Sequence, residues 1–165
     1  MAEAGARMRL AELIHPDAVV TELEATDRDG AIRELAAALV ESGAISADQL
    51  ETVVREAIAR ENQGTTGCGK GVAVPHVKLE NMDQQVATIG CSSHGLDFQS
   101  LDRAPVYTVL MLVSPKDRPE DHIGAMETIF GHLLRENFRR FLRQADSKEA
   151  ILEVIQDADE LGDDS

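Results

Sequence analysis

The predicted fold depends on the stretch Val106-Tyr107-Thr108-Val109-Leu110-Met111-Leu112-Val113, which is apolar almost without alternation. A strand with one face in water alternates apolar and polar side chains, whereas a nearly continuous apolar run is expected of a strand that is covered on both faces. We therefore place 106–113 in the centre of a β-sheet that has helices on either side. The run Val86-Ala87-Thr88-Ile89-Gly90-Cys91 predicts a second strand, and turns are expected at 95–98 and 102–105.

The N-terminal part of the chain predicts one more strand and two helices. Val19-Val20-Thr21-Glu22-Leu23 is rich in β-branched residues, which is typical of a strand. Asp27 or Asp29 can cap a helix that carries an apolar stripe on one face. Ser46 begins a capping box for a second amphipathic helix, which is expected to end near 60–62.

The residues after the central stretch predict three helices. One begins at about Pro119, a shorter one follows it, and Ser147 caps the last. The termini at 1–9 and 157–165 are expected to fray, the second because it is acidic. Since helices alternate with strands and no linker interrupts them, the whole chain is predicted to be a single α/β domain, with a mixed β-sheet between helices on both faces.

A glycine-rich segment precedes the predicted sheet and reads Gly64-Thr65-Thr66-Gly67-Cys68-Gly69-Lys70-Gly71-Val72-Ala73-Val74-Pro75-His76. Its glycines permit positive φ angles and allow main-chain N–H groups to converge on a ligand. Pro75 has no N–H and ends strand pairing, so we expect His76 to be presented rather than packed. An isolated histidine is more often structural or solvated, and it is the neighbouring residues that favour a functional role for His76.

The part of this segment over 66–76 resembles the active-site segment of the type-2 enzyme IIA domains, of the fructose/mannitol and nitrogen-regulatory kinds. Those domains belong to the bacterial phosphoenolpyruvate-dependent phosphotransferase system (PTS). In the family the segment reads Thr-Gly-hydrophobic-Gly-x-Gly-hydrophobic-Ala-hydrophobic-Pro-His, and its histidine accepts a phosphoryl group from the phosphocarrier protein HPr. Here Cys68 takes the hydrophobic position. Val77 departs from the family, which usually has a small residue there, and this departure concerns backbone geometry rather than chemistry.

The resemblance extends over nearly the whole chain. Weaker matches, in the order that the family has them, are Arg60-Glu61, Leu96-Asp97-Phe98, Pro105-Val106, Val113-Ser114-Pro115 and His122-Ile123. The resemblance implies an α/β sandwich and a phosphorylated His76. It also implies that His122 is a second active-site histidine, which lies beside the phosphorylated one and donates a hydrogen bond to the phosphoryl group.

Imidazole suits phosphoryl transfer because it is a neutral nucleophile near pH 7 and a good leaving group, so we take His76 as the nucleophile. In the transition state charge spreads over three oxygens, and we expect Arg60 and the N–H groups of Gly67 and Gly69 to bind them. The Thr66 hydroxyl is a further candidate. The alternatives are a solvated arginine at a helix C-terminus for Arg60 and a hydroxyl bonded to its own backbone for Thr66.

Composition narrows the class of partners. The 165 residues include 30 acidic and 16 basic ones, for a formal net charge of −14. Such a surface repels nucleic acid and anionic membranes, so a phosphate-binding site must be locally basic or lined by N–H donors. No apolar run is long enough to cross a bilayer and the N-terminus lacks a signal-peptide core, so we expect a cytoplasmic protein. Cys68 and Cys91 are expected to be reduced thiols.

Three classes of function remain open. The first is a PTS component, in which His76 takes a phosphoryl group from phospho-HPr and passes it to a IIB component or keeps it as a signal. The second is a nitrogen-type regulatory module, whose binding to target proteins depends on phosphorylation of His76. The absence of IIB and IIC segments in this sequence favours the regulatory member. The third is a metal site using His76 and His122, which is the weakest because these residues have no local ligand spacing. We interpret His15, His94 and His132 as structural or solvated, and expect no cofactor.

Overall fold

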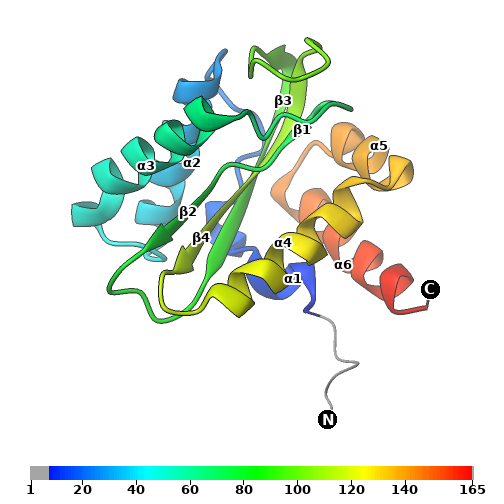
Figure 1. Ribbon diagram of the computed structural model, residues 1–165. Helices are drawn as coiled ribbons and strands as arrows, with labels where there is room; N and C mark the ends of the chain where they lie inside the picture. Colours follow the sequence, from blue (N-terminus) through cyan, green and yellow to red (C-terminus); the bar gives the residue numbers. More distant parts are fainter. Residues whose placement is uncertain (1–7, 165) are drawn as a thin grey trace.

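The computed structural model describes residues 8–164 of the chain. Within them, helices cover both sides of a small β-sheet (Figure 1). In chain order the elements are α1 (Leu10–Leu13), the 3-10 helix η1 (Pro16–Ala18), α2 (Arg28–Glu41), the 3-10 helix η2 (Ala47–Gln49), α3 (Leu50–Gln63), β1 (Val72–Ala73), β2 (His76–Leu79), β3 (Val86–Leu96), β4 (Val106–Pro115), α4 (Pro119–Leu133), α5 (Glu136–Gln144) and α6 (Lys148–Asp164).

β4 lies at the centre of the sheet, as its apolar sequence predicts. β3 pairs with it in antiparallel fashion, and β1 and β2 pair with it in parallel. Val109 is paired with residues of both β1 and β3, and Leu112 with residues of both β2 and β3. Since a strand has only two edges, β1 and β2 lie one after the other along the edge that β3 leaves free. The sheet is therefore mixed, as expected.

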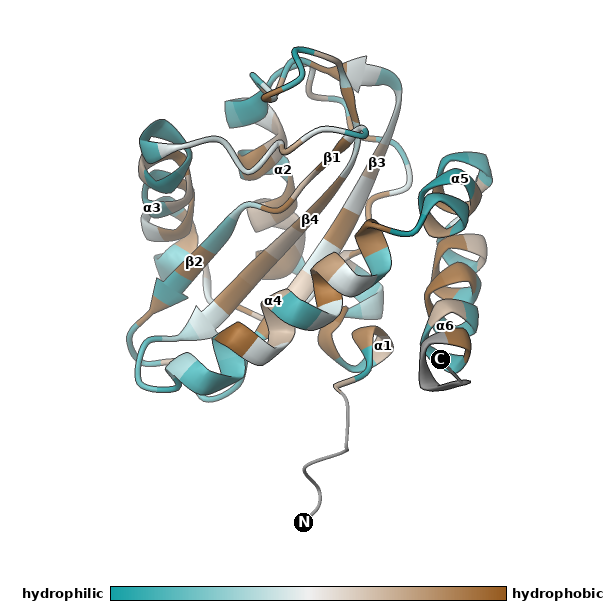
Figure 2. Ribbon diagram, turned by 45° about the vertical axis from the view of Figure 1, so that its right-hand side comes forward, coloured by the Kyte–Doolittle hydropathy of each residue, from teal (hydrophilic) through white to brown (hydrophobic). Residues whose placement is uncertain are grey.

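The side chains of β4 enter two separate cores. Val109, Met111 and Val113 are buried in the core beneath α2 and α3. Leu110 and Leu112 belong to the core beneath α1, α4, α5 and α6. Successive side chains of a strand point to opposite faces, so burial on both faces requires a continuous apolar run. Figure 2 shows apolar residues on the strands between the two layers of helices, and the predicted α/β class is confirmed.

The helices begin where their capping residues predict. Asp27 accepts a backbone N–H at the start of α2 at 2.9 Å. Ser46 forms the expected capping box, from which η2 leads into α3, and the last turn of α3 holds Arg60. Ser147 accepts a backbone N–H at the start of α6 at 3.0 Å. The position of Arg60 at the end of α3 places it next to the glycine-rich segment.

The strand predicted over 19–23 is wrong. Val20 forms a single parallel bridge with Gly90 of β3, and the chain bends directly after it. Leu23 then donates its N–H to a carbonyl of β3 at 2.7 Å. The β-branched residues are thus used for burial and for isolated contacts with the edge of β3, without a regular ladder. β3 also continues to Leu96, into the segment that was predicted as a turn.

The described C-terminal residues do not fray as predicted for 157–165, because α6 continues to Asp164. Asp159 is buried, and its carboxylate oxygens accept two backbone N–H groups at the start of α1, at 2.8 and 2.9 Å. This acidic run is therefore a helix whose inner face caps another helix. Of the fraying predicted for 1–9, residues 1–7 lie outside the described residues.

Candidate active site

His76 is the first residue of β2 and follows a break in the edge of the sheet. β1 ends at Ala73, and Pro75, which has no N–H, interrupts the pairing before β2 begins. Strand alternation places Val77 in the core beneath α2 and α3, so His76 points to the opposite face, where it meets a side chain of α4. The ring is half-buried there.

Val74 fixes the position of the proton on the His76 ring. Nδ1 lies 2.9 Å from the Val74 carbonyl oxygen. Since a carbonyl can only accept, Nδ1 carries the proton and Nε2 is left with a lone pair. Burial lowers the pKa of His76 by more than its hydrogen bond to Val74 raises it, and the charges of Arg60 and Lys78 lower that pKa further. The ring is therefore a neutral nucleophile near pH 7.

His122 comes from the start of α4 and lies against His76, with ring centroids 5.4 Å apart and ring planes tilted by 51°. The Ser114 hydroxyl at the end of β4 is 2.8 Å from its Nδ1. Burial lowers the pKa of His122 to about 4, and the charges of His76 and Lys78 act in the same direction. The ring is thus neutral at pH 7. Nε2 carries the proton when Ser114 donates to Nδ1, whereas Nδ1 carries it when the Ser114 hydroxyl donates instead to Gln85 Oε1, which lies 3.4 Å away.

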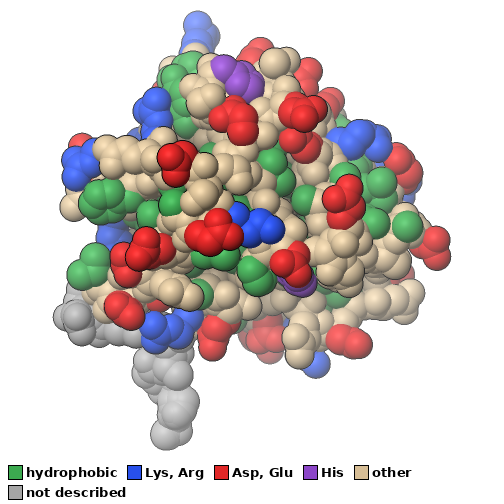
Figure 3. All heavy atoms as spheres, turned by 180° about the vertical axis from the view of Figure 1, so that it is seen from behind, with side chains coloured by type: hydrophobic (Ala, Val, Ile, Leu, Met, Phe, Trp, Pro, Cys, Tyr) green, Lys and Arg blue, Asp and Glu red, His purple; other side chains and the backbone are tan. Residues whose placement is uncertain are grey.

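Two cations act on His76. Arg60 donates from one Nη to the carbonyl of Gly64 at 2.8 Å, and within residues 8–164 its guanidinium makes no other hydrogen bond or ion pair. Lys78 follows His76 by two residues in β2 and therefore shares its face of the sheet. Sequence reasoning missed Lys78, although strand alternation after His76 could have found it. Two cations and one carboxyl group, that of Glu61, therefore act on His76, while acidic side chains are spread over surfaces such as the one in Figure 3.

The first part of the glycine-rich segment, 64–71, forms a glycine loop that packs against the residues following β3. The N–H of Gly67 donates to the Thr65 hydroxyl at 3.0 Å, and a Cβ at Gly67 would lie 2.5 Å from Ser100 Oγ, which leaves room only for glycine. Gly69 has a φ of 111° and lies against Asp102, whose carboxylate accepts a neighbouring N–H at 3.3 Å. The phosphate-binding role expected of Gly67 and Gly69 stays a prediction.

Thr66 lies between Glu61 of α3 and Val74, and its side chain contacts both. Its hydroxyl is 2.6 Å from Glu61 Oε2 and 3.2 Å from the N–H of Val74, and its own N–H donates to Glu61 Oε1 at 2.9 Å. Both Glu61 and Thr66 are buried. These contacts favour the alternative in which the hydroxyl serves the protein's own backbone, and a role in phosphate binding stays a prediction.

The other three histidines are bonded within the protein. His15 and His94 contact backbone groups at 3.2 and 3.1 Å, and His132 lies 2.8 Å from Asp159, which agrees with structural roles. Among residues 8–164, no cluster of three or more His, Cys, Asp or Glu side chains is placed to hold a metal ion. No helix in that part of the chain is long and apolar enough to span a membrane.

Comparison with known proteins gives a consistent set of relatives. The family model described as "Phosphoenolpyruvate-dependent sugar phosphotransferase system, EIIA 2" matches residues 12–158. The PTS system fructose-specific EIIABC component of Bacillus subtilis (strain 168) is 30% identical over 92% of this chain, which spans only 24% of that protein. The nitrogen regulatory protein of Bradyrhizobium diazoefficiens is 30% identical over 90% of this chain and 95% of its own length.

Solved structures share the fold. The nitrogen regulatory protein IIA-Ntr from Neisseria meningitidis superposes with a TM-score of 0.78 and 22% identity, covering 88% of this chain and 97% of its own. Enzyme IIAMTL from Escherichia coli, in a complex with phosphorylated enzyme IIBMTL, gives 0.70 and 18%, covering 88% and 99%. The family match over most of the sequence goes beyond likeness of fold. The chain belongs to the EIIA type 2 family of the phosphoenolpyruvate-dependent sugar phosphotransferase system, whose members are phosphotransfer components.

Proposed function

We propose that this protein is a phosphoryl carrier whose His76 accepts a phosphoryl group from HPr. The observation that carries the proposal is the hydrogen bond from Nδ1 of His76 to the Val74 carbonyl, which leaves the lone pair on Nε2. In the transfer, Nε2 forms a bond to phosphorus while the bond from phosphorus to its donor group on HPr breaks. The donor group on HPr keeps the electron pair of that bond, and the Nδ1 proton stays on the ring.

The neighbours of His76 support this chemistry. Charge spreads over three oxygens of the transferring group, so nearby cations and hydrogen-bond donors lower the barrier. Arg60 and Lys78 supply the positive charge, since both already act on the His76 ring. His122 donates to the phosphoryl group from Nε2, in the tautomer in which the Ser114 hydroxyl donates to Nδ1. Its pKa of about 4 makes the ring neutral at pH 7 before His76 is phosphorylated.

The acceptor of the group defines two versions of the function. One relative is named a fructose-specific EIIABC component, and one structural neighbour is a complex with phosphorylated IIB, which supports transfer from His76 to a IIB component. Another relative, equally identical, is named a nitrogen regulatory protein. It supports a regulatory version, in which phosphorylation of His76 changes the binding of target proteins.

Incubation with phosphoenolpyruvate, enzyme I and HPr, followed by measurement of the intact mass, tests the proposal. We expect one added phosphoryl group that is labile in acid and stable in base. It should be present in the wild type and in the control His132→Gln, and absent from His76→Ala. Modification of another residue, or none with an active HPr, would contradict the proposal.

A second incubation, of the phosphorylated protein with a IIB component, separates the two versions. Loss of the group to the IIB component supports the transport version. A phosphoryl group that stays on His76 and alters the affinity for a target protein supports the regulatory version.

A further inference from the structure

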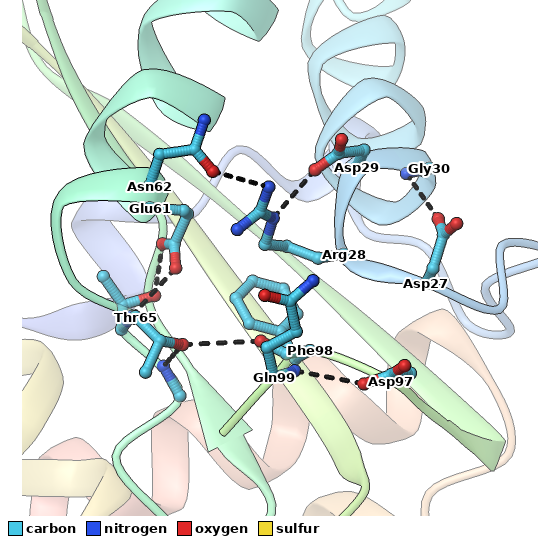
Figure 4. A network of polar contacts seen from close by, with 12 residues as sticks. Asp27, Arg28, Asp29, Gly30, Glu61, Asn62, Thr65, Asp97, Phe98 and Gln99 are labelled. Carbon is cyan, nitrogen blue, oxygen red and sulfur yellow. Dashed lines mark hydrogen bonds and ion pairs between the residues drawn. The ribbon is translucent and has the colours of Figure 1, made fainter. Parts of the chain in front are cut away.

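A chain of hydrogen bonds links the buried side chain of Glu61 to the ring of His76. The Thr66 hydroxyl donates to Glu61 Oε2 at 2.6 Å and accepts the N–H of Val74 at 3.2 Å. The carbonyl of Val74 in turn accepts Nδ1–H of His76 at 2.9 Å. Figure 4 shows Glu61 reaching from the end of α3 toward the glycine loop beside Thr65. The N–H and the carbonyl of Val74 belong to successive peptide groups, so the backbone of Val74 completes the connection from the end of α3 to the His76 ring.

Glu61 fixes the direction of this chain, because a carboxylate can only accept hydrogen bonds. The Thr66 hydroxyl proton must point to Glu61, which leaves the oxygen lone pairs for the N–H of Val74. Both carboxylate oxygens hold the same residue, since Oε1 accepts the N–H of Thr66 at 2.9 Å. Glu61 is 3% exposed, and among the described residues its side chain bonds to Thr66 alone. A buried carboxyl group that holds a single residue with both oxygens points to a role in positioning that residue.

We propose that Glu61 is a positioning residue, which acts through Thr66 and Val74 to hold His76 in the Nδ1–H tautomer. The Thr66 hydroxyl then serves the His76 ring and not the phosphoryl group. The catalytic consequence rests on the proposed function, because Nε2 must be unprotonated to accept a phosphoryl group. The tautomer itself is a property of the unmodified protein and can be measured without HPr.

Nitrogen-15 NMR of the imidazole rings reports which nitrogen of His76 carries the proton. At about pH 8, above the ordinary pKa of the ring, we expect the Nδ1–H form in the wild type. Thr66→Val removes the hydroxyl at nearly constant shape, and Glu61→Gln presents an amide donor where an acceptor is needed. Both changes should raise the fraction of the Nε2–H tautomer. They should also slow single-turnover phosphoryl acceptance from phospho-HPr about tenfold.

Two further variants control for general damage to the loop. Thr66→Ser keeps the hydroxyl and should keep the wild-type tautomer and rate. Thr65→Val removes the neighbouring hydroxyl, which accepts the N–H of Gly67 at 3.0 Å and lies 3.4 Å from a carbonyl of the segment after β3, but has no part in the chain to His76. It should keep the wild-type tautomer of His76.

The proposal is overturned if both Thr66→Val and Glu61→Gln keep the wild-type tautomer in a protein with the wild-type fold. If these variants do not fold, the Thr66 hydroxyl proton of the wild type decides the matter. Slow exchange of this hydroxyl proton with water supports the proposed hydrogen-bond connection to Glu61. Exchange as fast as that of an exposed hydroxyl overturns the proposal. A wild type that shows the Nδ1–H tautomer, loses it in the variants, and is never phosphorylated would contradict the proposed function and leave the role of Glu61 in place.

Discussion

His122 and His132 lie at opposite ends of α4 and are almost equally buried, with 7% and 8% of their surfaces exposed. Their partners differ. His122 has the Ser114 hydroxyl on Nδ1 and lies beside the ring of the proposed nucleophile. His132 lies between Asp159, 2.8 Å from Nε2, and Arg135, 2.5 Å from Nδ1. His122 and His132 are thus almost equally buried in the same helix but have different hydrogen-bond partners.

The difference lies in how much freedom the partners leave to the ring. A guanidinium can only donate, so Nδ1 of His132 accepts from Arg135 and its Nε2–H donates to Asp159. Asp159 also caps α1, so the ring joins α1, α4 and α6. A hydroxyl can donate or accept, so His122 can adopt either tautomer, and its Nε2 has no hydrogen-bond partner among the described residues. The partners of the two rings, and not their burial, therefore decide whether Nε2 is already bonded within the described residues.

The largest effect is expected from removing the carboxylate of Asp159. Asp159→Ala leaves Nε2–H of His132 and two N–H groups of α1 without an acceptor, so we expect the free energy of unfolding to fall by about 3 kcal/mol. Chemical denaturation measures the change, and Asp157→Ala, at an exposed position of α6, is the control. Phosphoryl acceptance by His76 should stay as in the wild type. A loss below about 1 kcal/mol would show that His132 is not held as described.

Substitution of the two histidines should separate transfer from stability. We expect His122→Ala to keep phosphoryl acceptance by His76 but to slow donation to an acceptor roughly ten- to hundredfold, because one hydrogen bond to a charged group is lost. His132→Ala should lower stability and leave both steps unchanged. Single-turnover transfer from phospho-HPr, and then from the phosphorylated variant, measures the two steps. Wild-type rates in both directions for His122→Ala would remove that residue from the site.

The fold could be predicted where the local pattern of apolar residues shows which side chains are buried. The apolar run over 106–113 identified the central strand, because a strand covered on both faces cannot alternate. The errors occurred where distant partners decide the outcome. Residues 19–23 have strand-like composition, but only isolated contacts reach β3. The acidic residues over 157–164 resemble a frayed end, yet Asp159 is held by α1 at the other end of the chain.

The site could be predicted in part. The pattern ending in Pro75-His76, and the order of weaker matches, selected His76 and His122, and the structure brings these two rings together. The contact of Ser114 with His122 depends on how α4 packs on the sheet. This packing cannot be read from a local sequence pattern. Glu61 was noted only as a neighbour of the arginine before it, because its burial depends on how the glycine loop folds back on α3.

The smallest expected effect is the pH dependence of stability that His122 contributes. Burial first, and then the neighbouring positive charges, lower its pKa from 6.5 to about 4 in the folded protein, so between these values the unfolded state binds a proton that the folded state does not. The contribution is therefore present above pH 6.5, is lost as the pH falls toward about 4, and does not change further below that. His122→Gln removes it and leaves the other titrating groups in place.

Denaturation of the wild type and His122→Gln across this pH range isolates the contribution. The free energy of unfolding of the wild type should fall relative to that of the variant by about 1 kcal/mol, less than the full pKa shift implies, because relaxation of the protein around the charged ring offsets part of the effect. The same experiment with His132→Gln shows how a ring held between a carboxylate and a guanidinium behaves. A constant difference between the wild type and His122→Gln would mean that folding does not change proton binding at His122.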